Sequence, residues 1–197
     1  MNNQITQTRK FEVFMIGVGG QGIGLLSEIL IRAVDYSGQV CVGVDTHGLA
    51  QRGGIVSSHL KIGNVNSPLV TPGNVDLVLA LERHEAARGM NYLKDGGILT
   101  YYDTSWQPLA VRLGRTSEIS DEEIETTAKE RHIRVYRVFK ELPDVRMQNI
   151  ALLGTVAKYE LIPKVNVHHY MQAMEDLMSP KILEENKRIF LEIVEVE

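Results

Sequence analysis

The 197-residue sequence contains a single cysteine, Cys41, and this scarcity excludes two kinds of chemistry. One cysteine cannot form an intrachain disulfide, and it cannot supply the four thiolates that commonly hold an iron–sulfur cluster. Cys41 lies in the apolar run Gln39-Val-Cys-Val-Gly-Val44. Because a free cysteine packs as a small hydrophobic side chain, we expect a buried structural thiol rather than a reactive one.

The sequence also lacks long apolar runs and clusters of basic residues. No stretch of 18 apolar residues is present, so no membrane-spanning helix is expected. The net charge of −4, with no Lys/Arg cluster, argues against nucleic-acid binding. Residues 1–10 are polar rather than signal-like and are predicted to form a flexible N-terminal tail. These features favour a cytoplasmic protein.

Most of the familiar catalytic motifs are absent. The sequence has no Gly-x-Ser-x-Gly elbow, no phosphate-loop lysine and no catalytic cysteine motif. His168 and His169 are adjacent, and adjacent positions of a helix do not share a face, so they do not form a metal pair. We therefore predict no catalytic residue and no metal site on this chain. Trp106 lies beside Pro108 in a predicted loop, where both a lid and a partner contact remain open.

What the chain has in quantity is glycine, and the densest group follows its first apolar strand. The run 13–18 leads into Gly17, Gly19, Gly20 and Gly22, and a helical pattern then covers 23–36. This is a G-x-G-x-x-G turn between a strand and a helix, which predicts an anion or nucleotide site at the helix N-terminus. A dinucleotide site would use Asp45, about 20 residues on, to hold a ribose. A tight turn that meets a partner chain is the alternative, and the extra Gly20 favours it.

A second glycine-rich loop follows the second predicted strand. It is His47-Gly-Leu-Ala-Gln-Arg-Gly-Gly54, and by chain order it leaves the same edge of the sheet as the first turn. Ligands of open α/β sheets gather at that edge. Arg52 could hold a carboxylate or phosphate through two hydrogen bonds, or form an ordinary salt bridge. The predicted ligand-binding or interface residues are Gly17, Gly19, Gly20, Gln21, Gly22, His47, Gln51, Arg52, Gly53 and Gly54.

The rest of the chain alternates strand and helix patterns. Strands are predicted at 39–44, 55–62, 75–81, 98–102 and 133–139, and helices at 82–92, 121–131, 147–161, 166–178 and from 180 onward. Ser120 with Glu123 predicts a capping box, and Pro180 suits a first helical position. The alternation in 55–62 is typical of a strand with one polar face, near an edge or an interface, whereas the apolar run 75–81 is typical of a fully buried parallel strand. Residues 11–197 are thus predicted to form a single three-layer, Rossmann-like α/β domain, with a mostly parallel sheet and helices on both faces.

Several motifs together resemble a known family. Gly17-Val-Gly-Gly-Gln-Gly-Ile23, the 47–54 loop, Val56-Ser-Ser-His-Leu-Lys-Ile-Gly63 and Asn149-Ile-Ala-Leu-Leu-Gly154 are similar to the gamma-type domain of 2-oxoacid:ferredoxin oxidoreductases. The late Asn186 also resembles that family. Within it, the His-Gly, Gln-Arg-Gly-Gly and Ser-His elements most resemble the beta subunit of the indolepyruvate type.

The resemblance implies a division of labour between two subunits. Enzymes of this family oxidatively decarboxylate a 2-oxoacid with coenzyme A and reduce ferredoxin, and cofactors carry the hard chemistry. This chain has one cysteine and lacks the Gly-Asp-Gly…Asn motif that places magnesium and thiamine diphosphate. Thiamine diphosphate, magnesium and iron–sulfur clusters are therefore expected on a larger alpha subunit, with coenzyme A as a possible shared substrate. An isolated chain is expected to be inactive.

Two other functions remain open from the sequence. A stand-alone NAD- or FAD-binding protein would use the first glycine turn and Asp45. A purely structural spacer would need neither glycine loop. The sequence identifies neither the 2-oxoacid, nor the stoichiometry of the assembly, nor whether the turn binds coenzyme A, another anion or only the partner chain.

Overall fold

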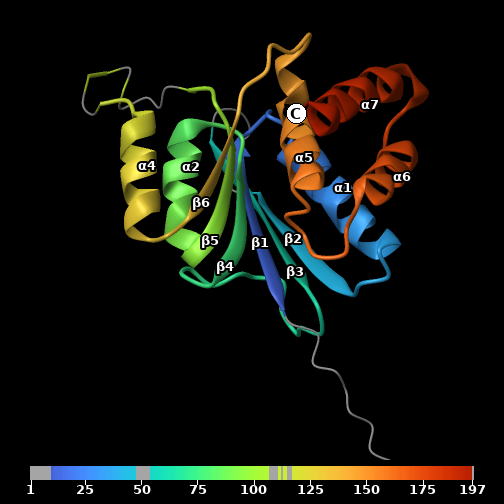
Figure 1. Cartoon of the computed structure of the whole chain (residues 1–197), viewed down its shortest axis with the longest axis horizontal. Helices are drawn as coiled ribbons and strands as arrows, with labels where there is room; N and C mark the ends of the chain where they lie inside the picture. The colour runs from blue at the N-terminus through green and yellow to red at the C-terminus, as the bar shows by residue number, and fades with distance from the viewer. Residues whose placement is uncertain (1–9, 48–53, 107–110, 112, 115–116, 197) are drawn as a thin grey trace, which may run out of the picture.

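In the computed structural model, residues 10–47, 54–106, 111, 113–114 and 117–196 are described. They form one six-stranded sheet between two layers of helices (Figure 1). The strands are β1 (Phe11–Val18), β2 (Cys41–His47), β3 (Ile55–Ile62), β4 (Val75–Ala80), β5 (Leu93–Tyr102) and β6 (Arg134–Val138). The helices are α1 (Ile23–Tyr36), α2 (Arg83–Gly89), α4 (Asp121–Glu130), α5 (Gln148–Lys158), α6 (Val167–Leu177) and α7 (Pro180–Glu195). Two short 3₁₀ turns are η1 (Met90–Tyr92) and η2 (Val145–Met147).

The sheet has the strand order β2-β3-β1-β4-β5-β6. Neighbours from β1 through β4 and β5 to β6 are parallel. Strand β3 runs antiparallel to both β1 and β2, so β2 points the same way as β1. Five strands therefore share one direction, and the predicted mostly parallel, three-layer α/β fold is confirmed. Strand β3 lies next to the edge strand, as its alternating pattern predicted.

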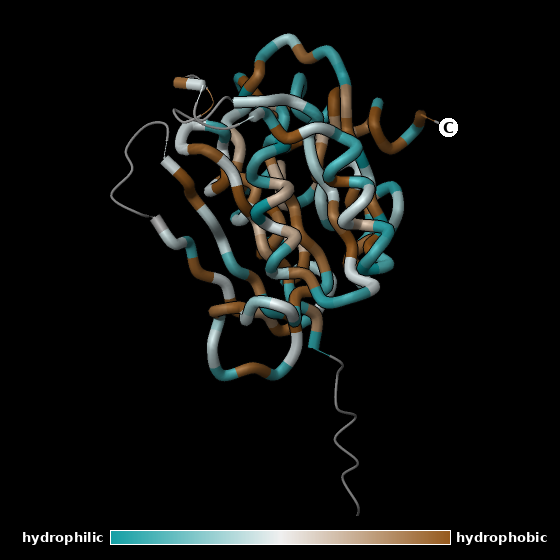
Figure 2. The backbone as a smooth tube through the Cα atoms, turned by 90° about the vertical axis from the view of Figure 1, so that its left-hand side faces the viewer, coloured by the Kyte–Doolittle hydropathy of each residue, from teal (hydrophilic) through white to brown (hydrophobic). Residues whose placement is uncertain are grey.

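Helices cover both faces of the sheet. In Figure 1, α2 and α4 lie on one face, and α1, α5, α6 and α7 lie on the other. Side chains of β1 alternate between the two layers: Val13 and Met15 belong to the core under α1 and α5, whereas Phe14 and Ile16 belong to the core under α2. Every residue of β4 is buried, and the strand is parallel to both neighbours, which confirms the prediction of a fully buried parallel strand. Figure 2 shows the hydrophobic strands behind helices of mixed hydropathy.

The helix termini follow the predicted signals. Ser120 and Glu123 form the predicted capping box at the start of α4. Asn166 caps α6 in the same way, with His169 as its reciprocal partner, and Pro180 occupies the first turn of α7. Within the described part of the chain, no helix is long and apolar enough to cross a bilayer. Of the predicted N-terminal tail, only Lys10 lies within the described residues.

Several predicted boundaries were wrong by a few residues, and three of them have a clear local reason. Strand β5 begins at Leu93 rather than 98, because Gly96 and Gly97 lie inside the strand, where its pairing with β4 shifts register. Strand β2 continues to His47 because it pairs with β3 over its whole length, so Asp45 lies within the strand. The helix predicted at 82–92 ends at Gly89 and continues as η1.

The topology determines where a ligand site can form. Helix α1 follows β1 on one face, and α2 follows β4 on the other, although β1 and β4 are neighbours (Figure 1). This is a topological switch point, where the loops at the carboxyl ends of two adjacent strands diverge and leave a crevice. The glycine turn of residues 19–22 lies at this point.

Candidate functional site at the switch point

The glycine turn is closed from inside by Gln21. Its side chain is 4% exposed, its Oε1 accepts a hydrogen bond from Val18 N at 2.7 Å, and its Nε2 donates to Leu81 O at 3.3 Å. Leu81 N in turn donates to Ile16 O at 3.0 Å. The Gln21 amide therefore joins the end of β1 to the end of β4. Its contribution to the site is to hold the turn in shape, since both ends of the amide are used inside the chain.

The glycine positions of the turn favour this residue for different structural reasons. A Cβ at Gly17 would lie 2.9 Å from Gln21 Oε1. Gly22 has φ 85°, and a Cβ there would lie 2.7 Å from Asn149 Nδ2. Gly20 has φ 104° but no atom within 4 Å of the Cβ position, so only its backbone conformation favours glycine. Internal packing accounts for Gly17 and Gly22, whereas Gly20 lies on open surface.

Helix α1 begins without any of the usual N-terminal partners. Gly22 is the N-cap residue, no side chain caps the helix, and the first turn contains no acidic residue. Among the described residues, the amides of Ile23 and Gly24 have no hydrogen-bond acceptor. The position of a Cβ on Gly24 is also open, with no atom within 4 Å. Free amides and the positive end of the helix dipole make this terminus suited to an anionic group.

The start of α5 supports the turn from the other side. Asn149 Nδ2 donates to Gly22 O at 3.2 Å, and Asn149 Oδ1 accepts from Ile150 N at 2.8 Å. This explains one motif of the family resemblance, because the asparagine ties α5 to the glycine turn. The glycine that ends the motif has a packing role: a Cβ on Gly154 would lie 2.8 Å from Ile193 Cβ of α7. Asn186 of α7 is buried and donates to Ile182 O at 2.7 Å.

The second glycine loop reaches the turn through Gly54. Gly19 N donates to Gly54 O at 2.8 Å, so the two loops are joined at the same edge of the sheet, as predicted. Residues 48–53, which include Gln51, Arg52 and Gly53, lie outside the described residues, and nothing is described of the His47 side chain. Their assignment to the site stays a prediction.

The predicted ribose contact of Asp45 does not fit the topology. Strand β3 lies between β2 and β1, so Asp45 is two strand spacings, about 10 Å, from the strand that leads into the turn. Its Oδ1 accepts a hydrogen bond from Ser58 Oγ at 2.5 Å. A dinucleotide held between the glycine turn and the end of β2 would need these strands to be adjacent. The geometry therefore disfavours the NAD or FAD alternative.

Across the crevice, the start of α2 carries buried carboxylates. Glu82 is fully buried and is the N-cap of α2, where its Oε1 accepts from Glu85 N and its Oε2 accepts from Trp106 N at 3.4 Å. Burial, helped by the nearby charge of Glu82, raises the pKa of Glu85 to about 7, although Arg88 opposes this shift. Trp106 itself is 48% exposed. The indole is therefore available for contact, while its backbone is anchored to α2.

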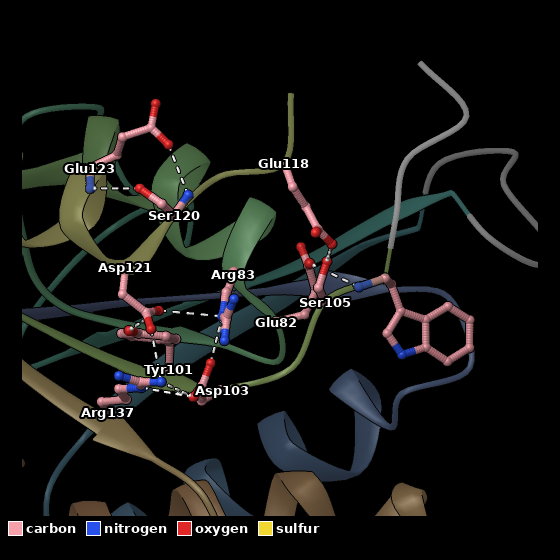
Figure 3. Close-up of polar contacts among 11 residues, drawn as sticks. Glu82, Arg83, Tyr101, Asp103, Ser105, Glu118, Ser120, Asp121, Glu123 and Arg137 are labelled. Atoms are coloured by element: carbon pink, nitrogen blue, oxygen red, sulfur yellow. Dashed lines mark hydrogen bonds and ion pairs between the residues drawn. The ribbon is translucent and has the colours of Figure 1, made fainter. Parts of the chain in front are cut away.

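An ion-pair network lies beyond this helix start, at the carboxyl ends of β5 and β6 (Figure 3). Asp103 accepts from Arg83 Nε at 2.5 Å and from Arg137 Nε at 2.7 Å. Asp121 of α4 lies 3.3 Å from Arg83 and 2.8 Å from Arg137. Burial alone would raise the pKa of Asp103, but its hydrogen bonds with the two guanidinium groups lower it overall. The network joins α2, α4, β5 and β6.

The sequence analysis did not predict this network, although the sequence contains one indication of it. Asp103 directly follows the apolar end of β5, and a charged residue at that place faces the ligand-binding edge of a parallel sheet. Its partners Arg83 and Arg137 come from segments far away in the sequence. Tyr101, in the same cluster, has its pKa raised to about 12, mainly by burial.

The remaining candidates take structural roles. His169 Nδ1 accepts from Asn166 N at 3.1 Å in the α6 capping box, and its ring centroid lies 6.4 Å from that of His168. Among the described residues, no group of three metal-ligating side chains is present. Cys41 is half-buried rather than buried, and burial together with the Asp35 charge raises the pKa of its thiol. A raised pKa keeps the thiol protonated and unreactive.

Comparison with known proteins identifies the family. The family model "Pyruvate ferredoxin/flavodoxin oxidoreductase" matches residues 12–196. The chain belongs to this family. It is 30% identical over 182 residues to indolepyruvate oxidoreductase subunit IorB of Archaeoglobus fulgidus, covering 90% of each chain. It is 29% identical over 190 residues to the subunit of the same name in Pyrococcus horikoshii, covering 92% of this chain and 93% of that one.

Solved structures of the family share the fold. A keto/oxoacid ferredoxin oxidoreductase gamma subunit from Geobacter sulfurreducens superposes with a TM-score of 0.63 at 21% identity, covering 94% of this chain and 96% of that one. A 2-oxoglutarate:ferredoxin oxidoreductase from Magnetococcus marinus gives a TM-score of 0.64 at 16% identity. The match covers 94% of this chain but only 30% of that much longer chain. The resemblance to this family inferred from the sequence motifs is confirmed.

Proposed function

We propose that this chain is the small subunit of an indolepyruvate-type 2-oxoacid:ferredoxin oxidoreductase and bears no cofactor itself. A larger subunit would carry thiamine diphosphate, magnesium and iron–sulfur clusters. The donor set of this chain does not fit an iron–sulfur cluster, because its only cysteine is Cys41. The relatives of similar length that are named as subunits support this division.

One observation carries the proposal. At the switch point, the polar side chains Gln21, Glu82 and Asn149 are hydrogen-bonded within the chain. Among the described residues, what remains open toward the outside is the N-terminus of α1, which offers backbone amides and carries no acid or base in its first turn. Such a site can bind and orient an anionic group but cannot by itself move a proton. It is therefore half of a site that a second chain completes.

The anion at this terminus would be a phosphate of coenzyme A or a carboxylate of the larger subunit. The 47–54 loop borders the turn through Gly54, so Arg52 remains a proposed contact of the same group. Trp106 is a proposed partner contact, because its indole is half exposed and its backbone is fixed to Glu82.

The first experiment is co-expression with the larger, cysteine-rich subunit. The two chains are expected to co-purify in a fixed ratio, and dye reduction that depends on a 2-oxoacid and coenzyme A should require both. If the small chain stays separate and the larger subunit is fully active alone, the proposal fails. Calorimetry of the isolated chain with NAD or FAD at millimolar concentration is expected to detect no binding, and clear binding would restore the dinucleotide alternative.

The second experiment uses Gly24, where a side chain has open space. Gly24→Asp puts a carboxylate beside the free amides, where it strengthens the helix but repels an anionic ligand. Gly24→Asn is the matched neutral control. We expect Gly24→Asp, but not Gly24→Asn, to raise the KM for coenzyme A or to weaken subunit association about five- to tenfold. If both variants match the natural protein in both measurements, the α1 terminus is not the anion site.

A further inference from the structure

A cavity lies at the opposite end of the sheet from the glycine turn. It has a volume of about 430 Å³ and is formed where β1 and β6 begin, beside the connection between α5 and α6. Because β1 spans eight residues, about 25 Å separates this cavity from the switch point. Its volume lies within the range of small-molecule sites, which is about 300–1,000 Å³.

The charge of the cavity is opposite to that of the whole chain. Its lining includes Lys10, Lys94, Arg134 and Lys164 but only one carboxylate, Asp76, whereas the whole chain carries a net charge of −4. Asp76 is already neutralised: it forms an ion pair with Lys94 and accepts a hydrogen bond from Glu12 N at 2.8 Å. Among the described residues, the other three cationic side chains of the lining have no carboxylate partner.

Such unpaired cations are uncommon in this protein. Within the residues that the structure describes, most lysines and arginines form an ion pair with a carboxylate. The five in these ranges that form none are Lys10, Arg134, Lys158, Lys164 and Lys181. Three of the five line this one cavity.

The backbone around the cavity is also unusual. Lys164 has φ 66°, a left-handed conformation that few residues other than glycine adopt. It follows Pro163, whose carbonyl accepts a hydrogen bond from Gln39 Nε2 at 2.8 Å, so the α5–α6 connection is fixed to the α1–β2 connection. Backbone strain of this kind clusters at ligand sites, where the surrounding structure maintains it. Here it holds a lysine in the lining of a cationic cavity.

The apolar part of the lining comes from Phe11, Ile98 and Pro163. A ligand that fits must therefore be small and multiply negatively charged, and it can present a less polar surface to these walls. A guanidinium with two ammonium groups suits phosphate oxygens, because the guanidinium binds them in pairs and the ammonium groups act as point charges. We propose that this cavity binds a small phosphate compound with two or more negative charges, such as a nucleoside diphosphate or inorganic pyrophosphate.

Calorimetric titration of the full-length chain with ADP, pyrophosphate and uncharged adenosine tests the proposal. ADP or pyrophosphate is expected to bind with one-to-one stoichiometry, more weakly as salt increases, while adenosine does not bind. Tighter binding of ADP would identify a nucleotide, and tighter binding of pyrophosphate an inorganic anion. If neither anion binds at millimolar concentration, the proposal is overturned.

Variants locate the bound anion. Arg134→Gln and Lys164→Gln should each weaken binding about tenfold, the loss expected for one charge-assisted hydrogen bond. Lys181→Gln removes the same charge from an unpaired, exposed lysine on α7 and should change nothing. If all three variants weaken anion binding equally, the anion is attracted by the overall charge of the surface, and the proposal of a specific site in the cavity is refuted. A loss caused by Gly24→Asp, with Arg134→Gln binding normally, would place the anion at the glycine turn and equally refute it.

Discussion

Gly22→Ala tests whether the glycine turn is held by internal packing. The substitution places a Cβ on a residue with φ 85°, which costs about 1–2 kcal/mol. The same Cβ would lie 2.7 Å from Asn149 Nδ2, so the Asn149 side chain must move and lose its hydrogen bond to the Gly22 carbonyl. That loss adds about 1 kcal/mol. We therefore expect the free energy of unfolding to fall by about 2–3 kcal/mol.

Urea or thermal unfolding measures this change directly. For a chain of this size, the loss corresponds to a fall in Tm of about 4–12 °C. Gly24→Ala is the control, because it also adds a methyl group near the start of α1 but in open space without positive φ. It should leave the stability unchanged or increase it by about 0.5–1 kcal/mol.

A double-mutant cycle separates the clash from the backbone strain. Asn149→Ala removes the atom that the new Cβ would meet, so Gly22→Ala in that background should cost only the backbone term. The two substitutions are thus expected to be non-additive by about 1 kcal/mol. If they are additive, or if Gly22→Ala alone is neutral, the packing of α5 against the glycine turn is not what requires glycine there.

Two further predictions concern the carboxylates beside the crevice. The folded-state pKa of Glu85 is raised from 4.5 to about 7, so the free energy of unfolding should fall by up to about 3 kcal/mol as the pH rises through this window. Urea unfolding of Glu85→Gln should show a flatter dependence on pH. Asp103 has a lowered pKa, so its contribution is present above its ordinary value of 3.8 and is lost as the pH falls through its folded-state pKa. Asp103→Ala should destabilise the protein by about 2–3 kcal/mol, because it leaves Arg83 and Arg137 facing one remaining carboxylate. Asp95→Ala breaks an exposed pair with Arg131 and is the control expected to change stability little. Equal losses for the two Asp→Ala variants would contradict the role assigned to the network.

The strand and helix patterns predicted the layers of this fold but not the order of its strands. Apolar periodicity reports which faces of a strand are buried, and it predicted one polar face for β3 and two buried faces for β4. The periodicity does not show whether β3 lies between β1 and β2 or on the far side of β2. The position of β3 determines whether a dinucleotide could bind in the predicted way, because β3 separates Asp45 from the glycine turn.

Local signals were predictable where a few neighbouring residues determine the structure. The capping box at Ser120 follows from side chains three residues apart and is confirmed. The start of β5 was predicted wrongly because glycine can form either a turn or an irregularity within a strand, and the partner strand decides which of the two Gly96 and Gly97 form. The Asp103 network was not predictable, since its partners come from elements that only the tertiary fold brings together.

The glycine turn illustrates how a motif can specify geometry without specifying a ligand. A G-x-G-x-x-G sequence requires close backbone approach, and here that approach is made by Gln21, Asn149 and Gly54 of the same chain. What a ligand or partner can still reach is the uncapped start of α1 beside Gly24. Helix amides attract any anion, so the turn alone does not choose between coenzyme A and a carboxylate of a second subunit. The Gly24→Asp and Gly24→Asn pair separates the two: a raised KM for coenzyme A in the charged variant alone indicates coenzyme A, whereas weaker subunit association in the charged variant alone indicates a carboxylate of the second subunit.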